Sequence, residues 1–84
     1  MLYDNFPNPF NPSTKVRFDI SASSNVKLAI YDAGGKEISV PVNSFLNAGK
    51  YEAAFDASGL ASGTYFYRLD AGEFSQTKKM VLLK

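Results

Sequence analysis

The sequence predicts an all-β fold, an antiparallel sandwich of about seven short strands. Apolar and polar side chains alternate with a period of two through most of the chain, as in strands that bury one face. Glycine, asparagine and aspartate interrupt these runs at roughly the eight-to-twelve-residue spacing of all-β domains, and no stretch has a helical period. A chain of 84 residues is long enough for one core, so we expect a single domain over residues 1–84.

The first two predicted strands are residues 15–20 and 26–31, separated by a break at 21–25. In both, the apolar side chains occupy alternate positions, which places them on one face of a sheet. The side chains expected to point inward are Val16, Phe18, Ile20, Val26, Leu28 and Ile30. Both strands are therefore expected to line the core.

A tight hairpin is predicted at Asp-Ala-Gly-Gly, residues 32–35, because glycine readily adopts the positive φ angles of such turns. The next predicted strand is 36–40. Its inward side chains are Ile38 and Val40. Pro41 has no ladder donor, so it should end this strand or place it at a sheet edge. A separate short edge strand is expected within 42–49.

The remaining predicted strands are residues 51–55, 65–69 and 74–84, joined by turns at 56–63 and 70–73. Their inward side chains include Tyr51, Ala53, Phe55, Tyr65, Tyr67 and Leu69. The spacing Leu60-x-x-Gly63-x-Tyr65 resembles the corner of immunoglobulin-like sandwiches, in which a tyrosine hydroxyl bonds to backbone a few residues upstream. The alternative is an ordinary core tyrosine that follows a loop.

Residues 1–14 form a proline-rich segment ahead of the sandwich, which is predicted over 15–84. Its prolines are Pro7, Pro9 and Pro12. Proline fixes φ and disfavours the helical region for the residue before it, so the segment should be stiff and extended. We expect Phe6 and Phe10 to anchor it to the sandwich, and Asn8 and Asn11 to cap local backbone. A rigid linker is favoured over a direct recognition role.

The composition disfavours an enzyme. The chain has no histidine and no cysteine, so the residues that most often activate nucleophiles or bind zinc are missing. Its aspartates are scattered through turns and strand ends, without the spacing of a calcium-binding loop. We therefore predict no catalytic residues, no cofactor-binding residues and no metal ligands.

Charge and hydropathy disfavour two classes of partner. Nine basic and eight acidic side chains give a net charge of +1, which would not attract nucleic acid. No apolar run approaches the roughly 18 residues of a membrane span, and the N-terminus lacks the features of a signal peptide. We expect the chain to be the C-terminal part of a longer protein.

Four motifs together resemble the C-terminal sorting domains of proteins exported by the type IX secretion system of Bacteroidota. The resemblance, to type A domains of the Por secretion tail family, covers the whole chain. The motifs are Pro7-Asn8-Pro9-Phe10, the strand Val26-x-Leu28-x-Ile30-Tyr31-Asp32 with Gly35-Lys36-Glu37-Ile38 after it, Gly63-x-Tyr65-x-Tyr67-x-Leu69, and Lys78-Lys79-Met80-Val81.

This resemblance implies an immunoglobulin-like sandwich that serves as a non-catalytic secretion and sorting signal. The cargo would pass through the periplasm and reach the cell surface or the medium. The implied partners are the outer-membrane type IX machinery and a sortase-like peptidase. In that family the last strand and its basic residues are important for export. The corresponding candidates here are Lys78, Lys79, Met80, Val81 and Lys84.

Other readings of the sequence stay open. A structural module, like the related immunoglobulin-like domain of flagellar hook-capping proteins, or a carbohydrate-binding module on a secreted enzyme would also be a β-sandwich. Sugar binding would require exposed aromatics, for which Tyr31, Phe66 and Phe74 are the candidates. Lysines on a last strand can simply protect its edge from aggregation. An open edge could also pair two copies into a homodimer.

Overall fold

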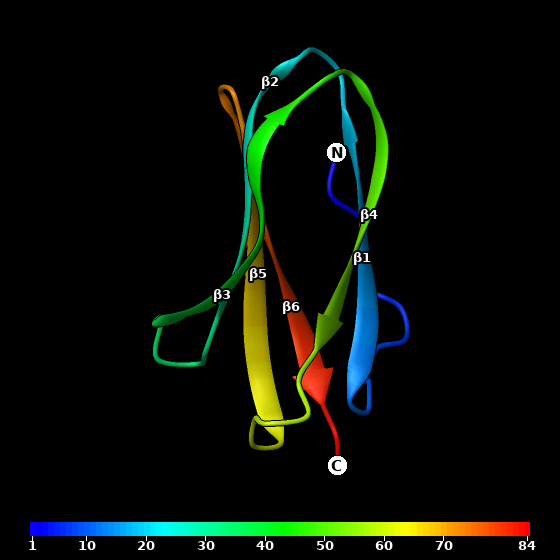
Figure 1. Ribbon diagram of the computed structural model, residues 1–84. Helices are drawn as coiled ribbons and strands as arrows, with labels where there is room; N and C mark the ends of the chain where they lie inside the picture. The colour runs from blue at the N-terminus through cyan, green and yellow to red at the C-terminus, as the bar shows by residue number, and fades with distance from the viewer.

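Six strands form two antiparallel sheets in the computed structural model, which describes residues 1–84 (Figure 1). The strands are β1 (Ser13–Ile20), β2 (Ser24–Tyr31), β3 (Glu37–Leu46), β4 (Gly49–Asp56), β5 (Gly63–Ala71) and β6 (Phe74–Leu82). The predicted all-β sandwich is confirmed, with six strands instead of seven. The structure contains no apolar helix of the length that a membrane span requires.

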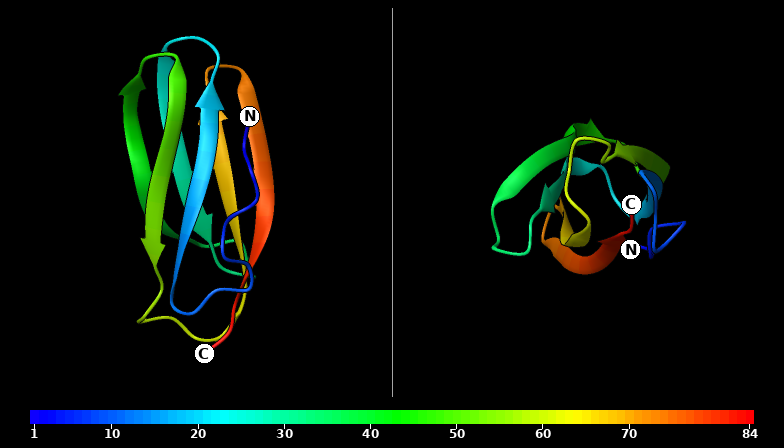
Figure 2. Two further views of the ribbon diagram at one scale, coloured as in Figure 1. Left: turned by 90° about the vertical axis from the view of Figure 1, so that its right-hand side faces the viewer. Right: turned by 90° about the horizontal axis from the view of Figure 1, so that it is seen from below.

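The two sheets face each other across the core. One sheet pairs β1 with β4, and the other has the order β3-β2-β5-β6. The chain changes sheet between β1 and β2, between β3 and β4, and between β4 and β5, whereas β2–β3 and β5–β6 are hairpins within one sheet. The molecule is elongated along its strands, with extents of 37 × 22 × 17 Å (Figure 2).

The predicted hairpin between β2 and β3 is present. The Asp32 carboxylate accepts hydrogen bonds from the backbone N–H of Gly34 at 3.0 Å and of Lys36 at 2.9 Å. Gly35 has a φ of +89°, in the left-handed region where glycine is free of steric strain. Aspartate and glycine therefore each have a defined function in this turn.

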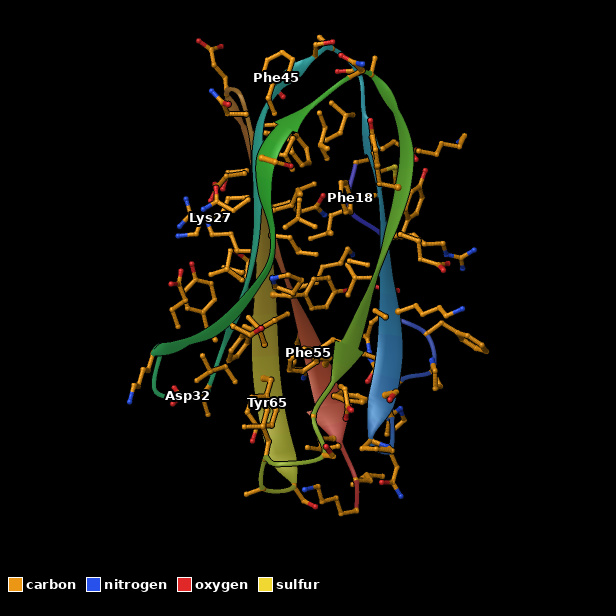
Figure 3. All side chains as sticks on the ribbon, viewed as in Figure 1. Phe18, Lys27, Asp32, Phe45, Phe55 and Tyr65 are labelled. Atoms are coloured by element: carbon orange, nitrogen blue, oxygen red, sulfur yellow. The ribbon has the colours of Figure 1, made fainter.

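The core is built from the alternate side chains that the sequence pattern places inward. Phe18 and Phe55 lie between the sheets, whereas Lys27 points to solvent from the outer face of the four-stranded sheet (Figure 3). The buried cluster comprises Leu2, Phe10, Val16, Phe18, Ile20, Val26, Leu28, Ile30, Phe55, Ala57, Tyr65, Tyr67, Leu69, Met80 and Leu82. Three of these residues, Leu2, Phe10 and Ala57, come from outside the strands.

The prediction of two separate strands around Pro41 was wrong. A single edge strand, β3, runs through this residue. The register skips from Ser39 opposite Ile30 to Val42 opposite Leu28, so two residues of β3 face one residue of β2 at a bulge. The bulge accommodates the missing proline donor, and it turns Val40, expected inward, to 37% exposure.

The N-terminal segment, defined here as residues 1–12, lies between β1 and β6 on the open side of the sandwich (Figure 2). It makes bridges to β1 at Leu2–Phe18 and Phe6–Lys15, and a parallel bridge to β6 at Phe10–Leu82. Seven of the eleven backbone hydrogen bonds outside the regular ladders involve this segment. It is therefore part of the folded domain, not a linker that precedes it.

Only one of the two predicted phenylalanine anchors is buried. Phe10 is 2% exposed and its ring centroid lies 6.4 Å from that of Phe55. Phe6 is 71% exposed, so its predicted anchoring role was wrong. The reason is register: Phe6 pairs with Lys15, whose side chain points outward, and cross-strand partners share a face.

Candidate functional site: the last strand and its surroundings

The last strand, β6, is an edge strand that is only partly covered. Ala71 and Phe74 close the β5–β6 hairpin, so the even-numbered residues of β6 bond to β5 and the odd-numbered ones direct their backbone groups away from it. The N-terminal segment covers part of the outer row: the Val81 carbonyl accepts from Phe10 N–H at 2.9 Å, and Leu83 N–H donates to the Phe10 carbonyl at 3.0 Å. These bonds cover the C-terminal end of the edge.

The remaining outward backbone groups of β6 belong to Ser75, Thr77 and Lys79. No turn, loop or side-chain hydrogen bond reaches these backbone groups. The backbone groups of these three exposed residues are therefore unpaired, although Leu2 and Asp4 of the N-terminal segment contact the side chains of Gln76 and Lys78 between them. Such a row of unpaired donors and acceptors can pair with an additional strand.

The five predicted sorting residues divide between the two faces of β6. Met80 is completely buried in the core. Lys78, on the same face, has a 27% exposed side chain and forms an ion pair with Asp4 at 3.1 Å. Lys79 and Val81 point to the outer face. Only Lys79 and Val81 of the predicted motif are therefore presented on the outer face of the strand. Lys78 and Met80 instead make contacts within the domain.

Lys79 is the cation of this strand that stays available. It is exposed and makes no ion pair, whereas Lys78 is engaged with Asp4. Lys84, the other predicted basic residue, donates from Nζ to the Ser58 carbonyl at 2.8 Å and from its backbone N–H to Ser62 Oγ at 3.0 Å. Lys84 therefore fastens the end of the chain to the β4–β5 loop.

The Pro7-Asn8-Pro9-Phe10 motif contacts the last strand directly. Asn8 Oδ1 accepts a hydrogen bond from Val81 N–H at 3.0 Å. The expected capping of local backbone by Asn8 is therefore replaced by a long-range contact. Together with the burial of Phe10, this bond shows that the first and last motifs of the chain meet at one edge of the sandwich.

Tyr67 connects the N-terminal segment to the interior. Its hydroxyl donates to the Tyr3 carbonyl at 2.8 Å and accepts from Asn5 N–H at 2.8 Å. Burial raises the pKa of Tyr67 to about 12. Asn5 also donates from Nδ2 to Thr14 Oγ1 at 3.0 Å, and both residues are buried. The burial of Asn5 and Thr14 was not predicted, although the alternation of β1, extended back by two residues from Val16, places Thr14 inward.

The raised pKa of Tyr67 predicts a loss of stability at high pH. The phenol ionises near its ordinary pKa of 10.0 in the unfolded chain and near 12 in the folded one. The stabilisation is therefore complete below pH 10 and falls by about 1.4 kcal/mol per pH unit up to 12. Urea unfolding at pH 8 to 12 measures this fall in the free energy of unfolding. Tyr67→Phe should remove this part of the slope, and an unchanged slope in that variant would contradict the assignment.

The predicted tyrosine corner is confirmed. The Tyr65 hydroxyl donates to the Ala61 carbonyl, four residues upstream, at 2.7 Å. Tyr65 is 8% exposed at the start of β5, so its ring packs in the core while its hydroxyl holds the preceding loop. The Gly63-x-Tyr65-x-Tyr67 motif therefore fixes two loops, the second through the contact of Tyr67 with the N-terminal segment.

The outer face of the two-stranded sheet carries a hollow of about 310 Å³ lined in part by Tyr3, Asp19 and Lys50. The Tyr3 hydroxyl donates to Asp19, which raises the pKa of the phenol and lowers that of the carboxyl. Lys50 Nζ lies 3.6 Å from the same carboxylate. Lys50 and Asp19 thus neutralise one another, whereas Arg17, which also lines the hollow, makes no ion pair.

The aromatics considered for sugar binding do not form one row. Tyr31 and Phe66 are cross-strand partners on the outer face of the four-stranded sheet, and both are half-buried. Phe74 pairs with Ala71 on the opposite face, near the hairpin tip. A planar platform of all three side chains is therefore absent.

These features define an immunoglobulin-like sandwich in which a buried N-terminal segment and a partly open last strand meet. A family model described as the secretion system C-terminal sorting domain matches residues 4–83. The chain belongs to this family, the sorting domains of type IX secretion. Comparison with curated proteins found no match. The predicted family is thus confirmed over nearly the whole chain, and it indicates a sorting signal for export.

Proposed function

We propose that this domain directs a larger cargo protein through the type IX secretion system to the cell surface or the medium, and that it catalyses no reaction itself. The match of the sorting-domain family to residues 4–83 is the observation that carries this proposal. The cargo crosses the periplasm on the way. The partners are the outer-membrane export machinery, which recognises the domain, and a sortase-like peptidase, which acts on the exported protein.

Recognition uses the free part of the β6 edge. A partner in extended conformation adds to the sheet by hydrogen bonds to the backbone of Ser75, Thr77 and Lys79, and a carboxylate of the partner pairs with the Lys79 ammonium. The unpaired backbone groups of these exposed residues and the unpaired side chain of Lys79 support this mode. The same lysine also discourages indiscriminate edge pairing, including pairing with a second copy of the chain.

A secretion assay tests the proposed function. Residues 1–84 are fused behind a periplasmic signal peptide and a fluorescent reporter, and the fusion is expressed in a host with type IX secretion and in an export-deficient mutant of that host. Export only in the competent strain is expected. Retention of the folded fusion in the periplasm of both strains would favour a structural or carbohydrate-binding module, and a glycan-binding screen would follow.

Charge reversal at Lys79 tests the mode of recognition. Lys79→Glu places a carboxylate opposite the partner's carboxylate, so the exported fraction should fall about tenfold or more, the effect of losing one good charged contact at an interface. Lys36→Glu is the matched control, because Lys36 is also exposed without an ion pair but lies in the β2–β3 turn. Equal export of the two variants would contradict recognition through Lys79.

A further inference from the structure

The outer face of the four-stranded sheet divides into a polar half and an aromatic half. The registers of β2, β5 and β6 align its outward side chains into rows that cross all three strands. The polar rows are Lys27–Asp70–Ser75 and Ala29–Arg68–Thr77, and the next row is Tyr31–Phe66–Lys79. Beyond it, Thr64 pairs with Val81. The two halves differ in chemistry although they lie on one continuous surface.

In the polar half the charges pair with one another. Lys27 lies 2.9 Å from Glu37, and Arg68 Nε lies 3.1 Å from Asp70. Arg68 Nε also donates to Ser75 Oγ at 3.1 Å. These internal pairs leave little unsatisfied charge for a partner, so this half behaves as an ordinary solvated sheet face.

The aromatic half is different. We name it the aromatic patch and define it by Tyr31, Thr64, Phe66, Lys79 and Val81. Its cation, Lys79, makes no ion pair, and its other four side chains are each partly exposed. Asp32 follows Tyr31 in the sequence, and its carboxylate already accepts hydrogen bonds from two backbone N–H groups. The patch therefore combines solvent-exposed apolar surface with one uncompensated positive charge.

The outer face of the opposite sheet differs in that most of its charges are paired. It bears the ion pairs Lys15–Glu52 and Lys50–Asp19, and Arg17 is its exposed cation without an ion pair. An antiparallel sheet normally presents polar side chains to water on its uncovered face. Aromatic side chains are enriched in protein interfaces, where they provide buried area, and an unpaired lysine beside them requires a carboxylate from elsewhere.

We propose that the aromatic patch is a docking surface for a component of the export machinery that presents an apolar cluster with a carboxylate facing Lys79. This inference rests on the proposed function and names the surface it uses. The patch spans β2, β5 and β6, so the partner recognises the folded sandwich and not only the terminal peptide. Lys79 belongs both to the patch and to the free edge of β6, which makes the two contact areas continuous.

Substitution of Phe66 tests the patch in the same secretion assay. Phe66→Thr removes the central aromatic ring while keeping a residue that favours strands, and the exported fraction should fall about tenfold, which corresponds to an interface residue worth about 1.4 kcal/mol. Phe45→Thr is the matched control: Phe45 is 60% exposed on the same outer face but lies at the other end of the sheet from Asp32 (Figure 3). It should be exported like the wild type.

A second variant keeps the test decisive if Phe66→Thr does not fold, which urea unfolding of the purified domain will show. Thr64→Glu adds bulk and a negative charge that would repel the partner's carboxylate, without removing packed apolar surface, and it should also reduce export. Wild-type export of both patch variants would overturn the docking surface while leaving the sorting function intact. Failure of the unmodified fusion to leave the competent strain would instead refute the proposed function.

Discussion

Phe10→Ala is expected to lower the free energy of unfolding by about 3–5 kcal/mol, the usual cost of deleting a buried phenylalanine. Phe10 is 2% exposed and bridges β6 by backbone hydrogen bonds, so the cavity would open where the N-terminal segment meets the sandwich. A domain of this size has a free energy of unfolding on the order of 5–10 kcal/mol. This one substitution therefore removes a large share of the stability.

The matched control lies four residues earlier. Phe6 belongs to the same segment but is 71% exposed, so Phe6→Ala should change stability by less than about 0.5 kcal/mol. Urea unfolding of the two purified variants, followed by circular dichroism, measures the difference. If both variants unfold at the same urea concentration, the N-terminal segment does not pack as described.

Truncation after Lys79 is expected to prevent folding. It removes Met80 and Leu82, both with no exposed surface, and each costs about 2–5 kcal/mol when its side chain is deleted from a core. It also removes the backbone to which Phe10 bonds. These losses together approach the whole stability of a domain of this size, so the far-ultraviolet circular dichroism spectrum should be that of an unfolded chain.

A shorter truncation provides the comparison. Removing Leu83 and Lys84 deletes an exposed leucine and the hydrogen bonds to Phe10, Ser58 and Ser62, and should cost about 1–2 kcal/mol while leaving the sandwich folded. A folded domain after loss of residues 80–84 would show that β6 contributes little to the core. It would also remove the structural explanation for any loss of export.

The truncation bears directly on how a sorting signal is identified. Deleting residues 78–84 is expected to block export, but the same deletion removes core side chains, so loss of export cannot by itself locate a recognition site. Lys79→Glu avoids this ambiguity, because Lys79 is exposed and makes no ion pair. The surface variants therefore separate recognition from folding, which terminal deletions cannot do.

Much of the strand pattern was predictable because side-chain alternation is local. Val16, Phe18 and Ile20 are all buried as expected, and the hairpin at residues 32–35 forms where aspartate and glycine indicate it. The tyrosine corner at Tyr65 was also predictable, since the hydroxyl reaches backbone only four residues away. In each case the relevant contacts lie within a few residues or follow from a period of two.

The errors concern contacts between distant parts of the chain. Pro41 was expected to end its strand or to place it at a sheet edge. The edge position is confirmed, and a bulge in the pairing with β2 keeps β3 continuous through the proline. Phe6 is exposed and Phe10 is buried because they pair with different residues, Lys15 on β1 and Leu82 on β6. Proline and phenylalanine in a local pattern do not specify such partners, because the register across strands is set by the whole sheet.

The candidate site shows the same division. Alternating strand positions and the motifs at both ends were enough to predict a β-sandwich of the sorting-domain family. Which terminal residues are displayed could not be predicted. Lys78 is engaged by Asp4, seventy-four positions away in the chain, while Lys79 stays free beside Phe66. The alternation that identifies a strand depends only on neighbouring residues. The exposure and the ion pairing of a charged side chain depend on which strands the fold brings together.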